Sequence, residues 1–78
     1  MQKIKLLWDF NGIDSLKTAQ HFNIHLEEFL GKEDIQFHNI GLDSVSDYHN
    51  ISYLIIDKQL VDQIKHALKP QRAFLHED

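Results

Sequence analysis

The chain has 78 residues, no cysteine and a formal net charge of −4, from twelve acidic and eight basic residues. This length predicts one domain, residues 1–78, with one small core. The lack of cysteine excludes disulfides and thiolate metal sites, so we expect a protein of the reducing cytoplasm. The basic residues form no stripe, which argues against a nucleic-acid partner. No leader and no apolar run of ~20 residues is present, so no membrane association is expected.

Residues 3–10 alternate between apolar and other side chains, and this period of two is typical of a strand with one apolar face. We expect the apolar face to point at the core; it consists of Ile4, Leu6, Trp8 and Phe10. A helix follows, capped at Gly12 or Asp14 and running to about Leu30, because apolar residues recur there at helical spacing. Gly31 stands where a left-handed residue often ends a helix.

A second strand is predicted over residues 35–40, where apolar side chains again alternate. The polar residues 41–50 are expected to form a loop. Residues 51–56, with the sequence ISYLII, form the longest nearly unbroken apolar run and are rich in β-branched and aromatic residues. Such a run predicts a central strand that is buried on both faces.

Asp57 is expected to cap a second helix over about residues 58–69. That helix should end before Pro70, because proline disfavours helical geometry in the residue before it. Residues 72–76 either form a short edge strand or stay irregular. The order strand, helix, strand, strand, helix and optional strand predicts a ferredoxin-like α+β two-layer sandwich, with an antiparallel sheet and both helices on one face.

The other face of this sheet, called the open face here, has no helix to cover it. It is expected to carry an apolar set: Leu7, Ile40, Ile51, Tyr53 and Ile55. Monomers rarely expose an apolar patch larger than a few hundred Å², so we predict a homodimer that buries the open face. The alternative is that residues 41–50 or 71–78 fold over it.

Polar side chains from adjacent strands interrupt this apolar set, as is typical of a small-molecule site. The candidate ligand-binding residues are Lys5, Asp9, His38, His49 and Tyr53. A polar rim with paired hydrogen bonds in a dimer interface is the alternative interpretation. His49 follows Asp47 and Tyr48 directly before the central strand, and these three residues suit either acid–base chemistry or an ordinary loop.

His21, His25 and Glu28 have the spacing of metal ligands on one helical face. They are expected to point to solvent, and no ligand from another element is evident, so neither a metal nor another cofactor is predicted. The chain also has no glycine-rich phosphate loop and no serine in a nucleophile-elbow pattern.

Three segments, LLWDFNG at residues 6–12, TAQHF at 18–22 and YLIID at 53–57, resemble small bacterial proteins of ferredoxin-like type that have no assigned activity. The likeness spans most of the chain in element order, and it implies this fold and a bacterial cytoplasmic origin. It carries no catalytic residue over. The sequence thus predicts a non-enzymatic homo-oligomeric binding or regulatory module. The alternative is a small enzyme of the dimeric α/β-barrel kind, with a pocket on the open face.

Overall fold

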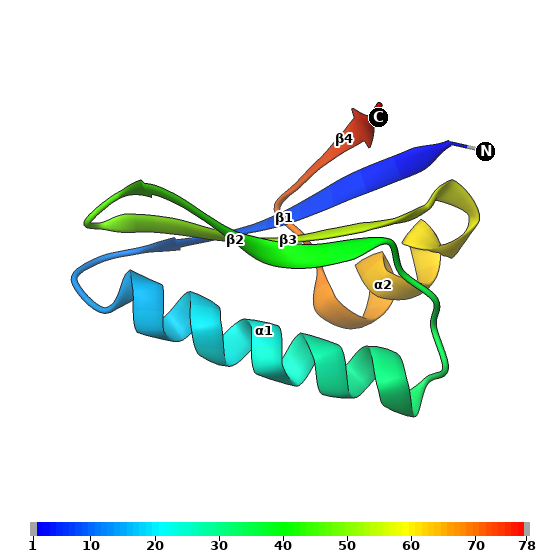
Figure 1. The fold of residues 1–78 in the computed structure, drawn as a ribbon, viewed down its shortest axis with the longest axis horizontal. Coiled ribbons are helices and arrows are strands. Elements are labelled where there is room, and N and C mark those ends of the chain that lie inside the picture. Colours follow the sequence, from blue (N-terminus) through cyan, green and yellow to red (C-terminus); the bar gives the residue numbers. More distant parts are fainter. Residues whose placement is uncertain (1, 78) are drawn as a thin grey trace.

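The computed structural model describes residues 2–77 and has an α+β architecture with a four-stranded antiparallel sheet and two helices. The elements in chain order are β1 (Lys3–Asn11), α1 (Ser15–Lys32), β2 (Asn39–Ser46), β3 (His49–Asp57), a 3₁₀ turn (Lys58–Leu60), α2 (Val61–Leu68) and β4 (Arg72–His76). Across the sheet the strands are ordered β2-β3-β1-β4, and each neighbouring pair is antiparallel. Both helices lie on one side of the sheet, and the other side is the open face (Figure 1).

The predicted orientation of β1 is confirmed, because its apolar residues face the helices. Leu6 and Trp8 are 0% and 5% exposed, and they belong to a buried cluster with Leu26, Leu30, Ile35, Leu54, Ile56 and Ile64. The Trp8 ring centroid lies 4.9 Å from that of Phe22 on α1. Its Nε1 donates a hydrogen bond to the carbonyl oxygen of Leu68 at the end of α2, at 2.9 Å. Trp8 therefore ties β1 to both helices.

The second strand was predicted too early in the chain. β2 begins at Asn39 rather than at residue 35, and it includes most of the segment that was predicted to be a loop. Only Asp47 and Tyr48 separate β2 from β3, so residues 41–46 pair with β3 apart from Val45, which lies in a bulge. Polar residues suit this position because β2 is an edge strand that is largely exposed to water.

This shift also changes the face on which Ile40 lies. Ile40 is paired with Leu54, which is fully buried on the helix side of β3, and it packs against the core cluster. Its predicted place on the open face was therefore wrong. Gly41, the next residue, takes the position on the open face opposite Tyr53.

The end of α1 explains why β2 starts late. The helix continues through Gly31 to Lys32, so the predicted left-handed role of Gly31 was wrong. Asp34 has the left-handed conformation instead, with a φ of 56°. Its N–H donates to the Gly31 oxygen, and the N–H of Ile35 donates to the Leu30 oxygen at 2.9 Å, which is the Schellman pattern. Ile35 packs in the same cluster as Leu30, so it closes the helix and does not enter a strand.

The second helical segment is shorter than predicted. Asp57 stands at the N-cap position without a side-chain capping bond, and a 3₁₀ turn precedes α2. α2 ends at Leu68, and the left-handed Lys69 (φ 49°) leads into Pro70. The chain then forms β4, which pairs with β1, so the optional last strand exists. Among residues 2–77, no helix combines the length and apolar character needed to cross a membrane.

Two glycines give a matched pair of predictions about packing. A Cβ at Gly41 would lie within 2.5–2.9 Å of the Tyr53 ring and hydroxyl, so Gly41→Ala should displace that ring and cost about 1–2 kcal/mol of unfolding free energy. A Cβ at Gly31, inside α1, meets nothing within 4 Å, so Gly31→Ala should stabilise by about 0.5–1 kcal/mol. Urea unfolding measures both values. Equal effects from the two changes would contradict the packing of Tyr53 on Gly41.

Candidate functional site

The open face is apolar in its centre but exposes little of this apolar area. Leu7, Ile51 and Ile55 are each 6% exposed. Leu7 lies between two large neighbours, Tyr53 on β3 and Arg72 on β4. The two isoleucines of β3 also lie between polar neighbours on β1 and β2, namely Asp9, Asp43, Lys5 and Asn39. The expected large exposed patch was therefore wrong, because neighbouring side chains cover it.

The alternative prediction, that residues 41–50 or 71–78 fold over the open face, was also wrong. Residues 41–46 and Arg72–His76 do not fold over the open face, because they are the two edge strands of the sheet itself. They contribute side chains to this face rather than backbone above it. The open face therefore consists of side chains that contact one another in three separate groups.

The first group consists of three residues around Asp9. The Arg72 guanidinium donates two hydrogen bonds to the Asp9 carboxylate, with Nε 3.0 Å from Oδ2 and Nη2 2.6 Å from Oδ1. His49 Nε2 lies 2.8 Å from Oδ1. The backbone N–H of Asp9 donates a hydrogen bond to the side-chain oxygen of Gln71. We call Asp9, His49 and Arg72 the Asp9 cluster.

The register of the sheet brings these three residues together. Asp9 is paired with Ile51, so His49 is its diagonal neighbour on the same face of β3. Arg72 is paired with Leu7, which makes it the diagonal neighbour on β4. Side chains at such positions can touch when at least one of them is long. The cluster thus joins three strands at one end of the open face.

The electrostatics of the Asp9 cluster favour a charged carboxylate. Burial raises the pKa of Asp9, but the hydrogen bonds from His49 and Arg72 and the positive charge of Arg72 hold it below its ordinary value. An ionised carboxylate only accepts hydrogen bonds, so His49 Nε2 carries the hydrogen of their contact. The side chains of Asp9, His49 and Arg72 are 17%, 32% and 44% exposed. A solute can therefore reach the histidine and the guanidinium more easily than the carboxylate.

The other two groups of contacting side chains lie further along the open face. Lys5 Nζ is 3.3 Å from Asp43 Oδ2 and 4.4 Å from the centroid of the Tyr53 ring, which is a cation–π geometry. His38 Nε2 is 2.7 Å from Asp57 Oδ1. Each of these basic groups therefore has an acidic partner from a different segment of the chain.

The five predicted site residues thus do not converge on one point. Asp9 contacts His49 and Lys5 contacts Tyr53, but Lys5 and Asp9 are four residues apart on one strand, or about 14 Å. The side chain of His38 contacts Asp57, which is not one of the five predicted site residues.

Sequence reasoning missed the partners Asp43, Asp57 and Arg72. Side chains two residues apart on a strand lie on the same face. Asp43 is two residues from Gly41 on β2, and Arg72 is two residues from Phe74 on β4, so a correct placement of both strands would have put them on the open face.

Two of the three candidate metal ligands of α1, His25 and Glu28, contact each other on the surface. His25 Nδ1 is 3.2 Å from Glu28 Oε1, and both side chains are about 70% exposed (73% and 69%). The ring centroids of His21 and His25 are 6.0 Å apart. Within residues 2–77, no group of three or more histidine, aspartate or glutamate side chains is placed to hold a metal.

We expect equimolar zinc to leave the melting temperature of the protein unchanged. A metal that binds only the folded state would raise this temperature by mass action, and two exposed histidines without a further ligand bind too weakly for that. Differential scanning fluorimetry with and without zinc makes the measurement. A clear rise that His21→Ala removes would contradict this expectation.

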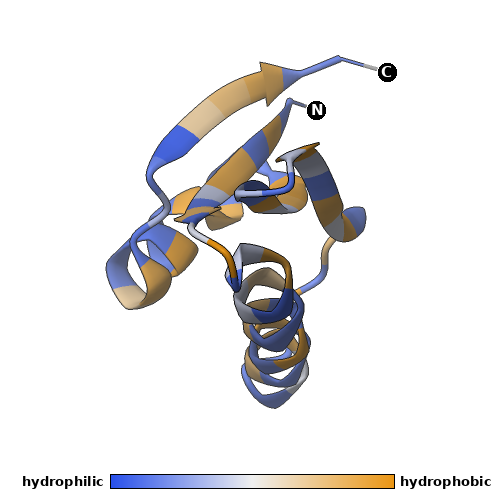
Figure 2. Cartoon of the chain, turned by 90° about the vertical axis from the view of Figure 1, so that its left-hand side faces the viewer, coloured by the Kyte–Doolittle hydropathy of each residue, from blue (hydrophilic) through white to orange (hydrophobic). Residues whose placement is uncertain are grey.

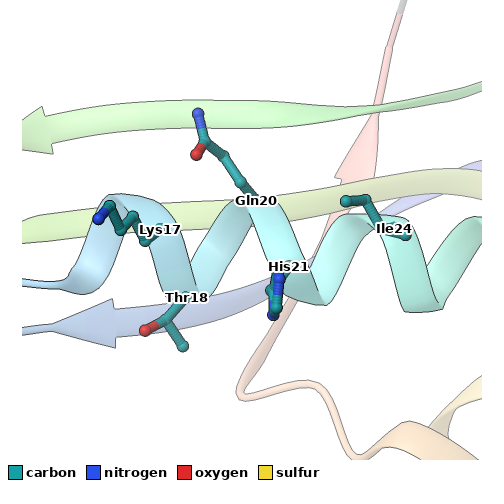
Figure 3. Close-up of a pocket in the computed structure, with 5 residues that line it drawn as sticks. All are labelled: Lys17, Thr18, Gln20, His21 and Ile24. Atoms are coloured by element: carbon teal, nitrogen blue, oxygen red, sulfur yellow. The ribbon is translucent and has the colours of Figure 1, made fainter.

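A shallow hollow with a volume of about 360 Å³ lies against α1. The side chains that line it are Lys17, Thr18, Gln20, His21 and Ile24 (Figure 3). All five belong to one helix, so polar groups from different elements do not converge there as they do around Asp9. The hollow is therefore the weaker candidate for a binding site.

Comparisons with known proteins give no relatives for this chain: no protein-family model, no curated protein and no solved structure matches it.

Proposed function

We propose that the protein is a small, non-enzymatic, homo-oligomeric binding or regulatory module of the bacterial cytoplasm. The observation that carries this proposal is the β4 edge of the open face, where the 52% exposed Phe74 lies opposite Lys5 and two residues from Arg72, so polar side chains surround an exposed apolar one. Polar rims around apolar centres are typical of surfaces that bind a partner. The absence of cysteine from the sequence is consistent with a reducing compartment.

We further propose a ferredoxin-like fold. Support comes from the chain order strand, helix, strand, strand, helix, strand and from the strand order β2-β3-β1-β4, with both helices on one side (Figure 1). The resemblance of segments 6–12, 18–22 and 53–57 to small bacterial proteins points in the same direction. It suggests no substrate.

The Asp9 cluster is the proposed binding site for a small-molecule ligand. Asp9 occupies two N–H groups of Arg72, and the guanidinium carries five in all. The remaining N–H groups of Arg72 and the second ring nitrogen of His49 are the atoms that a polar ligand can address. A planar anion suits the guanidinium best, because it can accept two parallel hydrogen bonds.

Native mass spectrometry of the purified protein tests the homo-oligomer. We expect a main peak at twice the mass of the 9.2 kDa chain when the protein is sprayed at about 50 micromolar, a concentration at which weak dimers are populated. Only the single-chain mass at this concentration would contradict the proposal.

One observation favours a second candidate function. The hydrogen bond between Asp9 and His49 is the arrangement by which a carboxylate orients a histidine for acid–base catalysis, as a small dimeric α/β-barrel enzyme would require. Incubation with a bacterial metabolite extract, followed by proton NMR, separates the two candidates. A binding module leaves the amount of every compound unchanged, whereas an enzyme depletes one of them and loses this activity in His49→Gln.

A further inference from the structure

The two edges of the sheet differ in how they are protected. The β2 edge carries Asp43 and two serines, and its pairing with β3 is interrupted by a bulge between Ser44 and Ser46. Charged side chains and bulges are the usual means by which proteins prevent an edge strand from pairing with another chain. β4, the other edge, has neither a bulge nor a proline in its five residues.

The centre of β4 is apolar and exposed on both sides of the sheet. Phe74, 52% exposed, lies on the open face opposite Lys5, and Leu75, 54% exposed, lies on the helix side opposite Ile4. Ala73 is also exposed. Figure 2 shows this apolar stretch on the outermost strand of the sheet. An added strand would find backbone partners at this edge and apolar contacts above and below it.

We propose that β4 pairs with β4 of a second copy in antiparallel orientation, about a two-fold axis at Phe74. This inference rests on the proposed homo-oligomer and names its surface. A two-fold axis normal to the sheet leaves both open faces on the same side of the combined sheet. Two paired residues then have their side chains on the same face, which requires that their residue numbers have an even sum. The register centred on Phe74 pairs all five residues, Arg72–His76.

The occupant is a second copy because the strand is complementary to itself in this register. Phe74 meets Phe74 of the second copy on the open face, and Ala73 meets Leu75 on the helix side. Aromatic and aliphatic cross-strand pairs of this kind stabilise a sheet. The outer pair is Arg72 with His76, and beyond it the amide of Gln71 stands opposite the carboxylate of Glu77. No acidic residue faces another acidic residue, although each chain has a net charge of −4.

The pairing also extends the Asp9 cluster across the two-fold axis. His76 of the second copy stands opposite Arg72, at a cross-strand Cβ separation of about 5 Å. The second copy thereby adds an imidazole to the rim of the proposed ligand site. The sheet becomes eight-stranded, and the two open faces form one surface. A ladder of five residues falls in the smallest class of interfaces, so the dimer should dissociate in the micromolar range.

Sedimentation velocity of three proteins tests which surface is used. Leu75→Lys places a charge at the edge but on the helix side, so it should weaken association at least tenfold by this proposal and leave a dimer stacked through the open faces intact. Val45→Lys, at an equally exposed position on β2, is the matched control and should associate like the wild type. Both positions are at least half exposed, and circular dichroism verifies that the variants fold.

The outcomes separate this inference from the proposed function. A wild-type dimer that Leu75→Lys leaves unchanged overturns the β4 pairing and leaves the homo-oligomer standing. A wild-type monomer at all concentrations overturns both. Loss of the dimer in Leu75→Lys alone supports both.

Cysteine cross-linking tests the register, since the chain has no cysteine of its own. In the proposed register the two Phe74 Cα atoms are about 5 Å apart, within reach of a disulfide, and the two Leu75 Cα atoms are about 8 Å apart, beyond it. Phe74→Cys should therefore oxidise mostly to a covalent dimer, and Leu75→Cys should stay mostly monomeric. Equal cross-linking of the two variants, or none in Phe74→Cys, overturns the register.

Discussion

Replacing Trp8 with alanine should remove about 3–5 kcal/mol from the free energy of unfolding. Trp8 is 5% exposed, its ring lies against Phe22 of α1, and its indole N–H binds the last carbonyl of α2. The change therefore leaves a cavity between the sheet and both helices, and it also leaves the Leu68 oxygen without this donor. Domains of this size have a total stability of about 5–10 kcal/mol, so the loss is a large fraction of it.

Trp8→Phe is the matched control for this experiment. Phenylalanine keeps an aromatic ring near Phe22 but cannot donate to Leu68, so it should cost roughly half as much or less. Urea unfolding followed by circular dichroism gives both values. A loss below about 1 kcal/mol for Trp8→Ala would mean that β1 turns its other face to the helices.

Asp9→Asn should lower the free energy of unfolding by about 1–3 kcal/mol at neutral pH. The carboxylate accepts two hydrogen bonds from Arg72 and one from His49, and an amide can accept fewer of them and carries no charge. Asp47→Asn, in the exposed turn between β2 and β3, is the control and should change stability by about 0.5 kcal/mol or less.

The pH dependence of this difference follows from the lowered pKa of Asp9. Because the pKa is lower in the folded state than in the unfolded state, the carboxylate stabilises the fold fully above its unfolded pKa, near 3.9. This contribution disappears as the pH falls through the folded-state pKa. The gap in unfolding free energy between wild type and Asp9→Asn should therefore narrow below about pH 4. A gap that widens in acid would contradict the ionised cluster.

Elements with a strong periodic pattern could be predicted from the sequence. The alternation over residues 3–10 fixed the faces of β1, and the run ISYLII marked β3 as the centre of the sheet. These signals are reliable because one face of each strand must exclude water, and a shift of one residue would expose it. The open-face position of Leu7 follows from the same rule. Both faces of β3 are apolar, so Ile51, Tyr53 and Ile55 were assigned to the open face because Tyr53 has a polar tip, and the register agrees.

The placement of β2 could not be predicted by the same reasoning. Ile35 has the apolar character of a strand residue, but it is used to close α1, through a left-handed Asp34 that no local pattern marks. The polar residues 41–46 resemble a loop because an edge strand needs little apolar surface. β3 also begins earlier than residue 51 and includes the buried polar residue Asn50, whose Nδ2 donates to Ser15 Oγ. Inside the strand, the buried Ser52 hydroxyl donates to the Ala19 carbonyl oxygen.

Two candidate site residues, Asp9 and Tyr53, were found on strands that were placed correctly, whereas the partners Asp43 and Arg72 were missed because β2 was misplaced and β4 was left optional. Asp9 and Tyr53 lie on correctly placed strands and therefore on the expected face. Arg72 was missed as a site residue because its role depends on whether β4 forms and on its register with β1. The sequence also could not predict the extent of cover over Leu7, since this depends on the long side chains of both neighbouring strands.

Amide hydrogen exchange measured at two protein concentrations tests the proposed assembly most directly. We expect the amides of β4 that point outward to exchange at least tenfold more slowly at a concentration well above the micromolar dissociation constant than well below it. The amides of β2, at the protected edge, should exchange at the same rate at both concentrations. Exchange in β4 that does not depend on concentration would contradict the proposed pairing of β4 with β4 of a second copy.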